Sequence, residues 1–225
     1  MKYTCKFKCK YLLLLVVVVM LGKSTTSYSQ MYFGGGVNLI KGFTVASPYL
    51  GFNLLGERMD DNRSLYANIS MTLNQKEKEQ YFPMTSSQGF SDTTILGNLT
   101  YRYNSIELGR RNYFGNDLEF GFGYYLAEHV TISYNTVGIS LSNYNSSNYH
   151  LPSTIPTKGN ILVVSVGGNA GMQYAFVRGI LFGEIGFNYA LLASPNNITA
   201  QNTTSFSSIN FNLLVGFKKT LHFGY

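Results

Sequence analysis

The sequence predicts an all-β protein, an eight-stranded antiparallel up-and-down transmembrane β-barrel. Three observations predict this class: apolar and polar side chains alternate along most of the chain, long and short turn-forming segments alternate between these stretches, and an export leader precedes them. Successive side chains of a strand point to opposite faces, so alternation of period two indicates strands with one apolar and one polar face. The predicted strands cover 31–40, 47–57, 64–79, 94–111, 117–139, 160–176, 179–193 and 205–223.

The first 29 residues are expected to be a secretory signal peptide that is cleaved after Ser29. Basic residues precede a 12-residue apolar run, YLLLLVVVVMLG, which is shorter than the roughly 20 residues that a membrane helix needs. Residues 30–225 are then one mature domain. Both cysteines, Cys5 and Cys9, lie in the leader, so the mature chain has no disulfide and no cysteine ligand for a metal.

The basic charge of the whole chain belongs to the leader. Five of the 17 basic residues and none of the 11 acidic ones lie there, which leaves 12 basic and 11 acidic residues, a net charge of +1. The sequence therefore gives no indication of a nucleic-acid partner.

The two faces of the predicted strands indicate lipid outside and a narrow lumen inside. In the last strand, Phe211, Leu213 and Val215 alternate with Asn210, Asn212 and Gly216. The polar face carries Gly, Asn, Ser and Thr with few charges, which suits an interior filled by side chains better than a surface in bulk water. A soluble, periplasmic lipocalin-like binder remains the alternative. Aromatic residues near strand ends are expected to form interfacial girdles: Tyr81, Phe82, Tyr113, Phe114, Tyr189, Phe223 and Tyr225.

The connections follow the rule of outer-membrane barrels, in which long extracellular loops alternate with short periplasmic turns. Apart from a short first loop at 41–46, the longer connections are 80–93, 142–160 and 194–205. The segment 117–141 is long for one strand, so ten strands are the alternative.

The last strand, SINFNLLVGFKKTLHFGY, carries alternating apolar residues and ends on an aromatic one. It resembles the C-terminal signal that the barrel-assembly machinery reads, carried here by Phe217, Leu221, Phe223 and Tyr225. Together with the leader and segments such as MYFGGGVNLI and LFGEIGFNYALL, the chain resembles the OmpA/OmpX-type outer membrane protein beta-barrel domain family. The resemblance implies a bacterial outer-membrane location, contact with outer-membrane lipid or lipopolysaccharide, and insertion by that machinery. It is specific for fold and weak for function.

Polar residues on the inward face form the best internal group of candidates. Because an unpaired buried charge is costly, we expect the charges to pair in a structural network. A polar conduit, a narrow pore, is the alternative. The predicted lumen residues are Arg102, Glu119, Glu184, Lys218, Asn169, Asn188, Asn210 and Asn212.

Catalysis, metal binding and cofactor binding are not expected. The three histidines, His129, His150 and His222, have no nucleophile or carboxylate at a matching spacing and are interpreted as scattered surface residues. The His-x-Ser-Asn element of lipid A deacylases is not met at His129, so a lipid A-modifying enzyme is a minor alternative. The acidic cluster Glu57, Asp60 and Asp61 lacks the spacing of a calcium loop and is predicted to be a solvated turn.

The long loop is the most promising place for a specific function, because loops on rigid scaffolds carry recognition. Tyr144, Tyr149, His150 and Leu151 are the candidate contact residues of its tip. The sequence thus favours a structural or interaction role through extracellular loops, with a surface protein or ligand as a possible partner.

Overall fold

A computed structural model describes residues 30–42, 48–86, 93–114, 120–141, 149–150, 158–196 and 208–221. The predicted signal peptide lies outside these residues. The strands are β1 (Gln30–Gly42), β2 (Tyr49–Asp60), β3 (Arg63–Thr72), β4 (Gln75–Ser86), β5 (Thr93–Phe114), β6 (Gly121–Leu141), β7 (Tyr149–His150), β8 (Lys158–Phe176), β9 (Gly179–Asn196) and β10 (Ile209–Leu221). No described segment is a helix long and apolar enough to cross a membrane.

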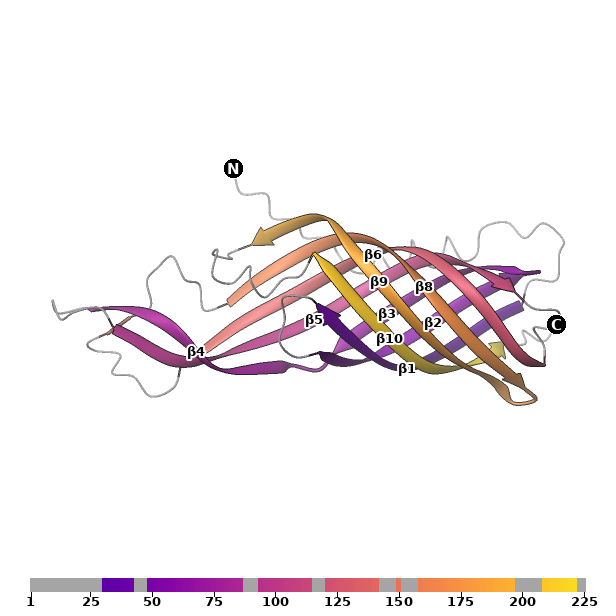
Figure 1. The fold of residues 1–225 in the computed structure, drawn as a ribbon, viewed down its shortest axis with the longest axis horizontal. Helices are drawn as coiled ribbons and strands as arrows, with labels where there is room; N and C mark the ends of the chain where they lie inside the picture. Colours follow the sequence, from indigo (N-terminus) through magenta and orange to yellow (C-terminus); the bar gives the residue numbers. More distant parts are fainter. Residues whose placement is uncertain are drawn as a thin grey trace.

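Eight of these strands close into a ring (Figure 1). Every neighbouring pair is antiparallel, in the order β1, β2, β3, β5, β6, β8, β9 and β10. The pairing of β10 with β1 and of β3 with β5 completes the circuit. The predicted eight-stranded up-and-down barrel is therefore confirmed. The ten-strand alternative is wrong for the ring, since β6 is one continuous strand of 21 residues.

The predicted strand 64–79 is wrong in extent, because it is two strands. β3 ends at Thr72 and β4 begins at Gln75, and both pair with β5. β3 pairs with the second half of β5 in the barrel wall, whereas β4 pairs with its first half, from Thr93 to Tyr101. The first half of β5 and β4 form a ribbon that extends past the rim (Figure 1). The short strand β7 pairs with the far end of β4.

The strand ends define two ends of the ring. The turns 61–62 and 177–178 lie at one end, together with the strand ends Phe114 and Gly121. This end also holds the first and last described residues of the wall, since Met31 pairs with Leu221. The ribbon lies at the other end, together with the strand ends Gly42, Leu141 and Asn196. We call these the short-turn end and the loop end.

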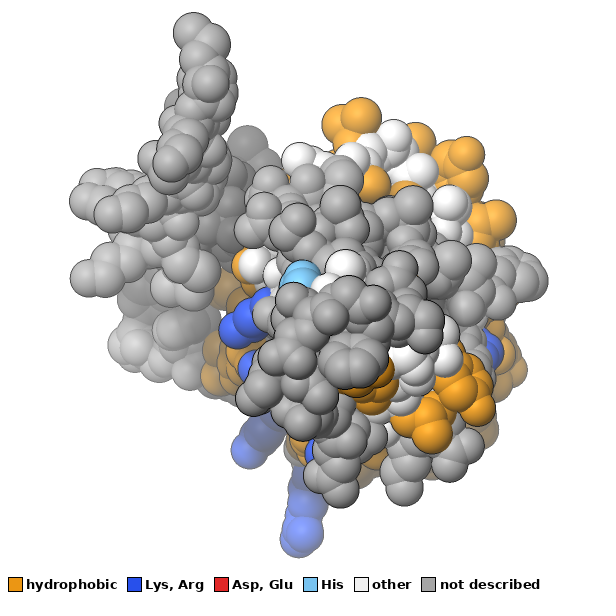
Figure 2. Space-filling model, turned by 90° about the vertical axis from the view of Figure 1, so that its left-hand side faces the viewer, with side chains coloured by type: hydrophobic (Ala, Val, Ile, Leu, Met, Phe, Trp, Pro, Cys, Tyr) orange, Lys and Arg blue, Asp and Glu red, His pale blue; other side chains and the backbone are white. Residues whose placement is uncertain are grey.

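The outer wall is apolar. Large hydrophobic side chains are half exposed at alternate positions of every ring strand, for example Phe52, Leu126 and Val215. Viewed from the loop end, hydrophobic side chains surround much of the wall (Figure 2). An ion pair of register partners, Arg110 and Glu128 at 2.7 Å, interrupts this face. Apolar outside and polar inside is the arrangement expected in lipid, and the reverse of that expected for a soluble binder.

The predicted aromatic girdle is correct only in part. Phe114 and Tyr189 are exposed on ring strands, whereas Tyr81 is exposed on the ribbon. Tyr113 is 4% exposed and points into the barrel, because it shares the inward face of β5 with Tyr101 and Tyr103. The side chain of Phe82, and Phe223 and Tyr225, lie outside the described residues.

Candidate functional site: a polar plug across the barrel

Four charged side chains meet inside the barrel: Glu57 of β2, Arg111 of β5, Glu184 of β9 and Lys218 of β10, none more than 3% exposed. Each occupies an inward position of its strand, in step with the alternating burial along that strand. Adjacent strands supply inward glycines that make room. A side chain at Gly171, for example, would overlap the ring of Tyr125.

The four charges form a continuous chain of ion pairs. Lys218 Nζ lies 2.7 Å from Glu57 Oε2, and Arg111 Nη1 lies 2.8 Å from the same oxygen. The other terminal nitrogen of Arg111 donates to Glu184 Oε1. In the ring of eight, β5 and β10 are four strands apart in either direction. The chain of ion pairs therefore crosses the full width of the lumen.

Neutral donors supply further hydrogen bonds to the two carboxylates. Ser64 Oγ donates to Glu57 Oε1 at 2.5 Å, and the hydroxyl of Tyr113 donates to the same oxygen. The hydroxyl of Tyr125 donates to Glu184 Oε1 at 2.7 Å, and Asn169 Nδ2 to Glu184 Oε2 at 3.1 Å. Two carboxylates and two cations balance in charge. A buried network of this kind is stable only when its members are paired and hydrogen-bonded in this way.

Aromatic rings fill the space around the charges. The guanidinium carbon of Arg111 lies 4.3 Å from the centre of the Tyr66 ring and 5.0 Å from that of Tyr125. Lys218 Nζ lies 5.3 Å from both the Tyr32 and the Tyr113 ring centres. We call this set, the four charges with these rings, the plug. A further buried cluster lies toward the loop end and consists of Ile40, Tyr49, Leu99, Tyr101, Tyr103 and Val137.

A second polar layer lies beside the plug and is centred on His129. The hydroxyl of Tyr66 donates to Glu107 Oε1 at 2.7 Å and lies 3.3 Å from His129 Nδ1. His129 Nε2 lies 2.7 Å from Asn188 Oδ1 and 3.7 Å from Glu107 Oε2. A histidine between a carboxylate and a tyrosine has acid–base capacity. However, His129, Glu107, Tyr66 and Asn188 are each 5% exposed or less, so a substrate would have to displace the packing to reach them.

The predicted lumen residues fall into three groups. Glu184, Lys218, Asn169 and Asn188 are buried in the interior, and Asn210 and Asn212 are half-buried on the inward face of β10. Arg102 was expected inside but is exposed on the outer face, because Tyr101 and Tyr103 take the inward positions. Glu119 lies outside the described residues.

Two interpretations of single residues are wrong. Glu57 is not in a solvated turn: β2 continues to Asp60, so Glu57 is inside the wall and 0% exposed. His129 is not a surface residue but lies in the second layer. Glu107, Arg111 and Tyr125 are interior residues that were not among the predicted lumen residues. Continuing the inward alternation of β5 from Tyr101 would have placed Glu107 and Arg111 on one face.

The remaining candidates lie away from the plug. Tyr149 and His150 form β7 and pair with Ser86 and Thr85, whereas Tyr144 and Leu151 lie outside the described residues. Phe217 and Leu221 point outward from β10, and Phe223 and Tyr225 are not described. Within the described ranges, no three His, Cys, Asp or Glu side chains come together as a metal site.

Ring and plug together define a class, the closed small β-barrel with an apolar exterior. Two solved structures share the fold. Neisserial surface protein A (NspA) is similar with a TM-score of 0.50 and 10% identity, over 86% of this chain and 97% of that one. A major outer membrane protein from Thermus thermophilus is similar with a TM-score of 0.50 and 10% identity, over 86% of this chain and 100% of that one. At this identity the likeness concerns the fold alone. No family model matches the chain, and no curated protein matches its sequence.

Proposed function

We propose that this chain is an integral protein of a bacterial outer membrane with a structural or interaction role, which it performs through the parts beyond the membrane. One observation carries the proposal: the exterior of the ring is apolar while the plug crosses its interior. An apolar wall suits a lipid environment. A plugged interior leaves the loop end as the surface that is available for recognition.

The ribbon supports this role. Its paired stretch of β5, from Thr93 to Tyr101, is about 30 Å long at the usual rise per strand residue. It stands on a closed ring (Figure 1), at the end where β6 ends at Leu141 and β9 ends at Asn196. Rigid scaffolds that present loops are the common arrangement for recognition. In this proposal, outer-membrane lipid surrounds the wall, the barrel-assembly machinery inserts it, and a surface protein or ligand binds at the ribbon and loops.

Binding by the loop end is tested with a shortened ribbon. Replacing residues 77–99 by Asn-Gly joins Lys76 to Thr100, which are register partners, through a favoured hairpin turn. Cells that display the wild type or the shortened protein are compared for binding to a panel of soluble proteins and polysaccharides. We expect the wild type to bind a member of the panel and the shortened protein to lose that binding. Equal binding by both would contradict a role for the ribbon.

The narrow pore is tested by conductance in planar bilayers. Since the ion pairs from Lys218 to Glu184 span the lumen, we expect the wild type to give no steady ohmic openings. The conductance of the wild type is compared with that of Arg111→Ala, which removes the central cation of the plug and opens the interior. Steady openings of the wild type would contradict the plugged interior and favour the pore.

Catalysis is tested separately. The second layer is enclosed by packing, so we expect that deletion of the gene leaves the mass spectrum of lipid A unchanged. A lipid A species that changes on deletion and is restored by the wild type, but not by His129→Gln, would contradict the non-enzymatic role.

A further inference from the structure

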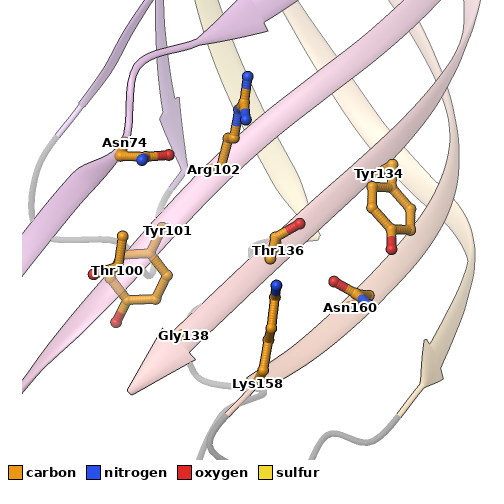
Figure 3. Close-up of a pocket in the computed structure, with 9 residues that line it drawn as sticks. All are labelled: Asn74, Thr100, Tyr101, Arg102, Tyr134, Thr136, Gly138, Lys158 and Asn160. Atoms are coloured by element: carbon orange, nitrogen blue, oxygen red, sulfur yellow. The ribbon is translucent and has the colours of Figure 1, made fainter. Parts of the chain in front are cut away.

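A pocket of about 450 Å³ lies on the outside of the wall, near the loop end. It is lined by residues of β5, β6 and β8 and by Asn74, which links β3 to β4 (Figure 3). Thr100 and Arg102 of β5, Thr136 and Gly138 of β6, and Lys158 and Asn160 of β8 occupy outward positions, opposite in parity to the buried residues of the same strands. Tyr101, an inward residue of β5, also lines the pocket, but no residue of the plug does, so the pocket is separate from the plug.

The pocket begins where the apolar wall ends. Along β6, the outward residues Val130, Ile132 and Tyr134 are exposed and mostly apolar, and the next two outward positions are Thr136 and Gly138. Along β8, the same change occurs between Leu162 and Asn160. In a membrane, this level is the boundary between acyl chains and headgroups, which Tyr134 would mark as an interfacial aromatic residue.

Cations surround the pocket. Arg102 and Lys158 are exposed, and no described carboxylate forms an ion pair with either. Lys76, the register partner of Thr100, is a third exposed cation nearby. Viewed from the loop end, described Lys and Arg side chains are visible and no described Asp or Glu side chain is (Figure 2).

The pocket has space and neutral donors between the cations. β6 lies between Arg102 and Lys158, since Arg102 pairs with Thr136, and Gly138 with Lys158. Figure 3 shows Lys158 extending toward Thr136, with Asn160 and Tyr134 on one side and Arg102 and Asn74 on the other. A Cβ added at Gly138 would meet nothing within 4 Å. Guanidinium, ammonium, hydroxyl and amide groups around an open space are the chemistry that holds a phosphate group.

We infer that this pocket binds the phosphate headgroup of an amphiphile whose acyl chains lie on the apolar wall below Tyr134. The inference rests on the proposed membrane location. The apolar surface directly beneath the cations favours an amphiphile over a free anion, because it offers the acyl chains a place that a free phosphate does not use.

The experiment measures binding to the full mature chain in neutral detergent by native mass spectrometry. The probes are diphosphorylated lipid A, its dephosphorylated form and inorganic phosphate. The test variant is Arg102→Gln with Lys158→Gln. The matched control is Arg63→Gln with Arg178→Gln, which removes the same charge from exposed residues of the short-turn end. A second test variant, Gly138→Phe, fills the pocket without changing charge.

We expect the wild type to bind diphosphorylated lipid A and both test variants to bind it about tenfold or more weakly. The glutamine variant loses charged hydrogen bonds to the phosphate, and in Gly138→Phe the ring occupies the space that the phosphate needs. The control should bind within about twofold of the wild type, as exposed charges far from the site contribute little. Unchanged affinity in the test variants would overturn the inference. So would equal binding of the dephosphorylated form, or of inorganic phosphate at the same concentration.

Failure of the proposed function gives a different result. A wild type that shows no heat-dependent gel shift and is not found in outer membranes would sink the membrane location itself. A wild type that shows the shift but binds none of the probes would overturn only the headgroup site.

Discussion

Among the single residues, Arg111 makes the contacts that connect the interior of the barrel. It contacts both carboxylates of the plug and lies against the Tyr66 and Tyr125 rings. Because β2, β5 and β9 are separated around the ring, one side chain connects three parts of the wall. Removing one member of such a network leaves an uncompensated buried charge, whereas removing both members of a pair does not.

This difference is testable with Glu57 and Lys218. We expect Lys218→Met to lower the free energy of unfolding by about 3–5 kcal/mol, because the Glu57 carboxylate loses one of its two cations in a buried site. The double variant with Glu57→Gln should lose less than the sum of the two single variants, with a coupling of about 1–3 kcal/mol. Urea unfolding in lipid vesicles measures the free energy of unfolding of the wild type, the two single variants and the double variant. Additive losses would contradict the pairing of these two residues.

Gly171 is a second residue with a specific requirement. An added Cβ would overlap the Tyr125 ring, which is 1% exposed and cannot move into solvent. We expect Gly171→Ala to cost about 1–3 kcal/mol through overpacking. Gly138→Ala is the control, since its Cβ would point into open space. Equal stability of the two alanine variants would show that the ring does not lie over Gly171.

Sequence alternation placed some inward residues correctly and not others. Glu184 and Lys218 lie in strands whose outward positions are mostly apolar, for example Ile185 and Phe217, so the sequence indicates their inward position. The strand with Arg102 carries polar or amphipathic side chains on both faces, and its tyrosines suit either a lumen or an interface. The sequence therefore did not show which side chains of this strand point inward. The partners of a buried charge come from distant strands, and a single sequence does not show them.

Among the strands, the division of 64–79 into β3 and β4 shows that the alternation of side chains does not reveal which strands pair. Both strands pair with β5, so the strand pattern of the sequence continues on both sides of residues 73–74. Whether a strand is part of the closed ring or of a ribbon depends on its second neighbour. β3 also pairs with β2, whereas β4 pairs with the short strand β7. The identity of this second neighbour is set by the tertiary structure and cannot be read from the local sequence.

Closure of the ring depends on β3 and β5 and not on the ribbon. Ile106 pairs with Ile69 in the wall, and Ile95 pairs with Phe82 in the ribbon. Proline removes a ladder hydrogen bond and is poorly tolerated in central strands. We expect Ile106→Pro to abolish the heat-modifiable form on SDS gels, and Ile95→Pro and the shortened ribbon to retain it. Loss of that form in all three would show that the ribbon is part of the closing structure.

At the scale of the whole molecule, the sequence predicted the architecture well and the site poorly. Fold class and ring strand count follow from alternation and connection length, which repeat in every element and so tolerate local errors. The plug is one set of contacts among seven strands, including those of Glu57, Tyr66 and Arg111, and it depends on register. The outer pocket likewise exists only because β5, β6 and β8 are neighbours.

Heat-dependent mobility on SDS gels tests most directly whether the chain is a closed barrel in an outer membrane. A closed wall pairs its backbone groups and resists SDS until it is heated, so unboiled and boiled samples of purified outer membranes are compared on SDS gels. We predict that the protein is found in this fraction and runs faster unboiled than boiled. A protein recovered soluble in the periplasm, with the same mobility before and after boiling, would contradict the membrane barrel and favour a lipocalin-like ligand binder.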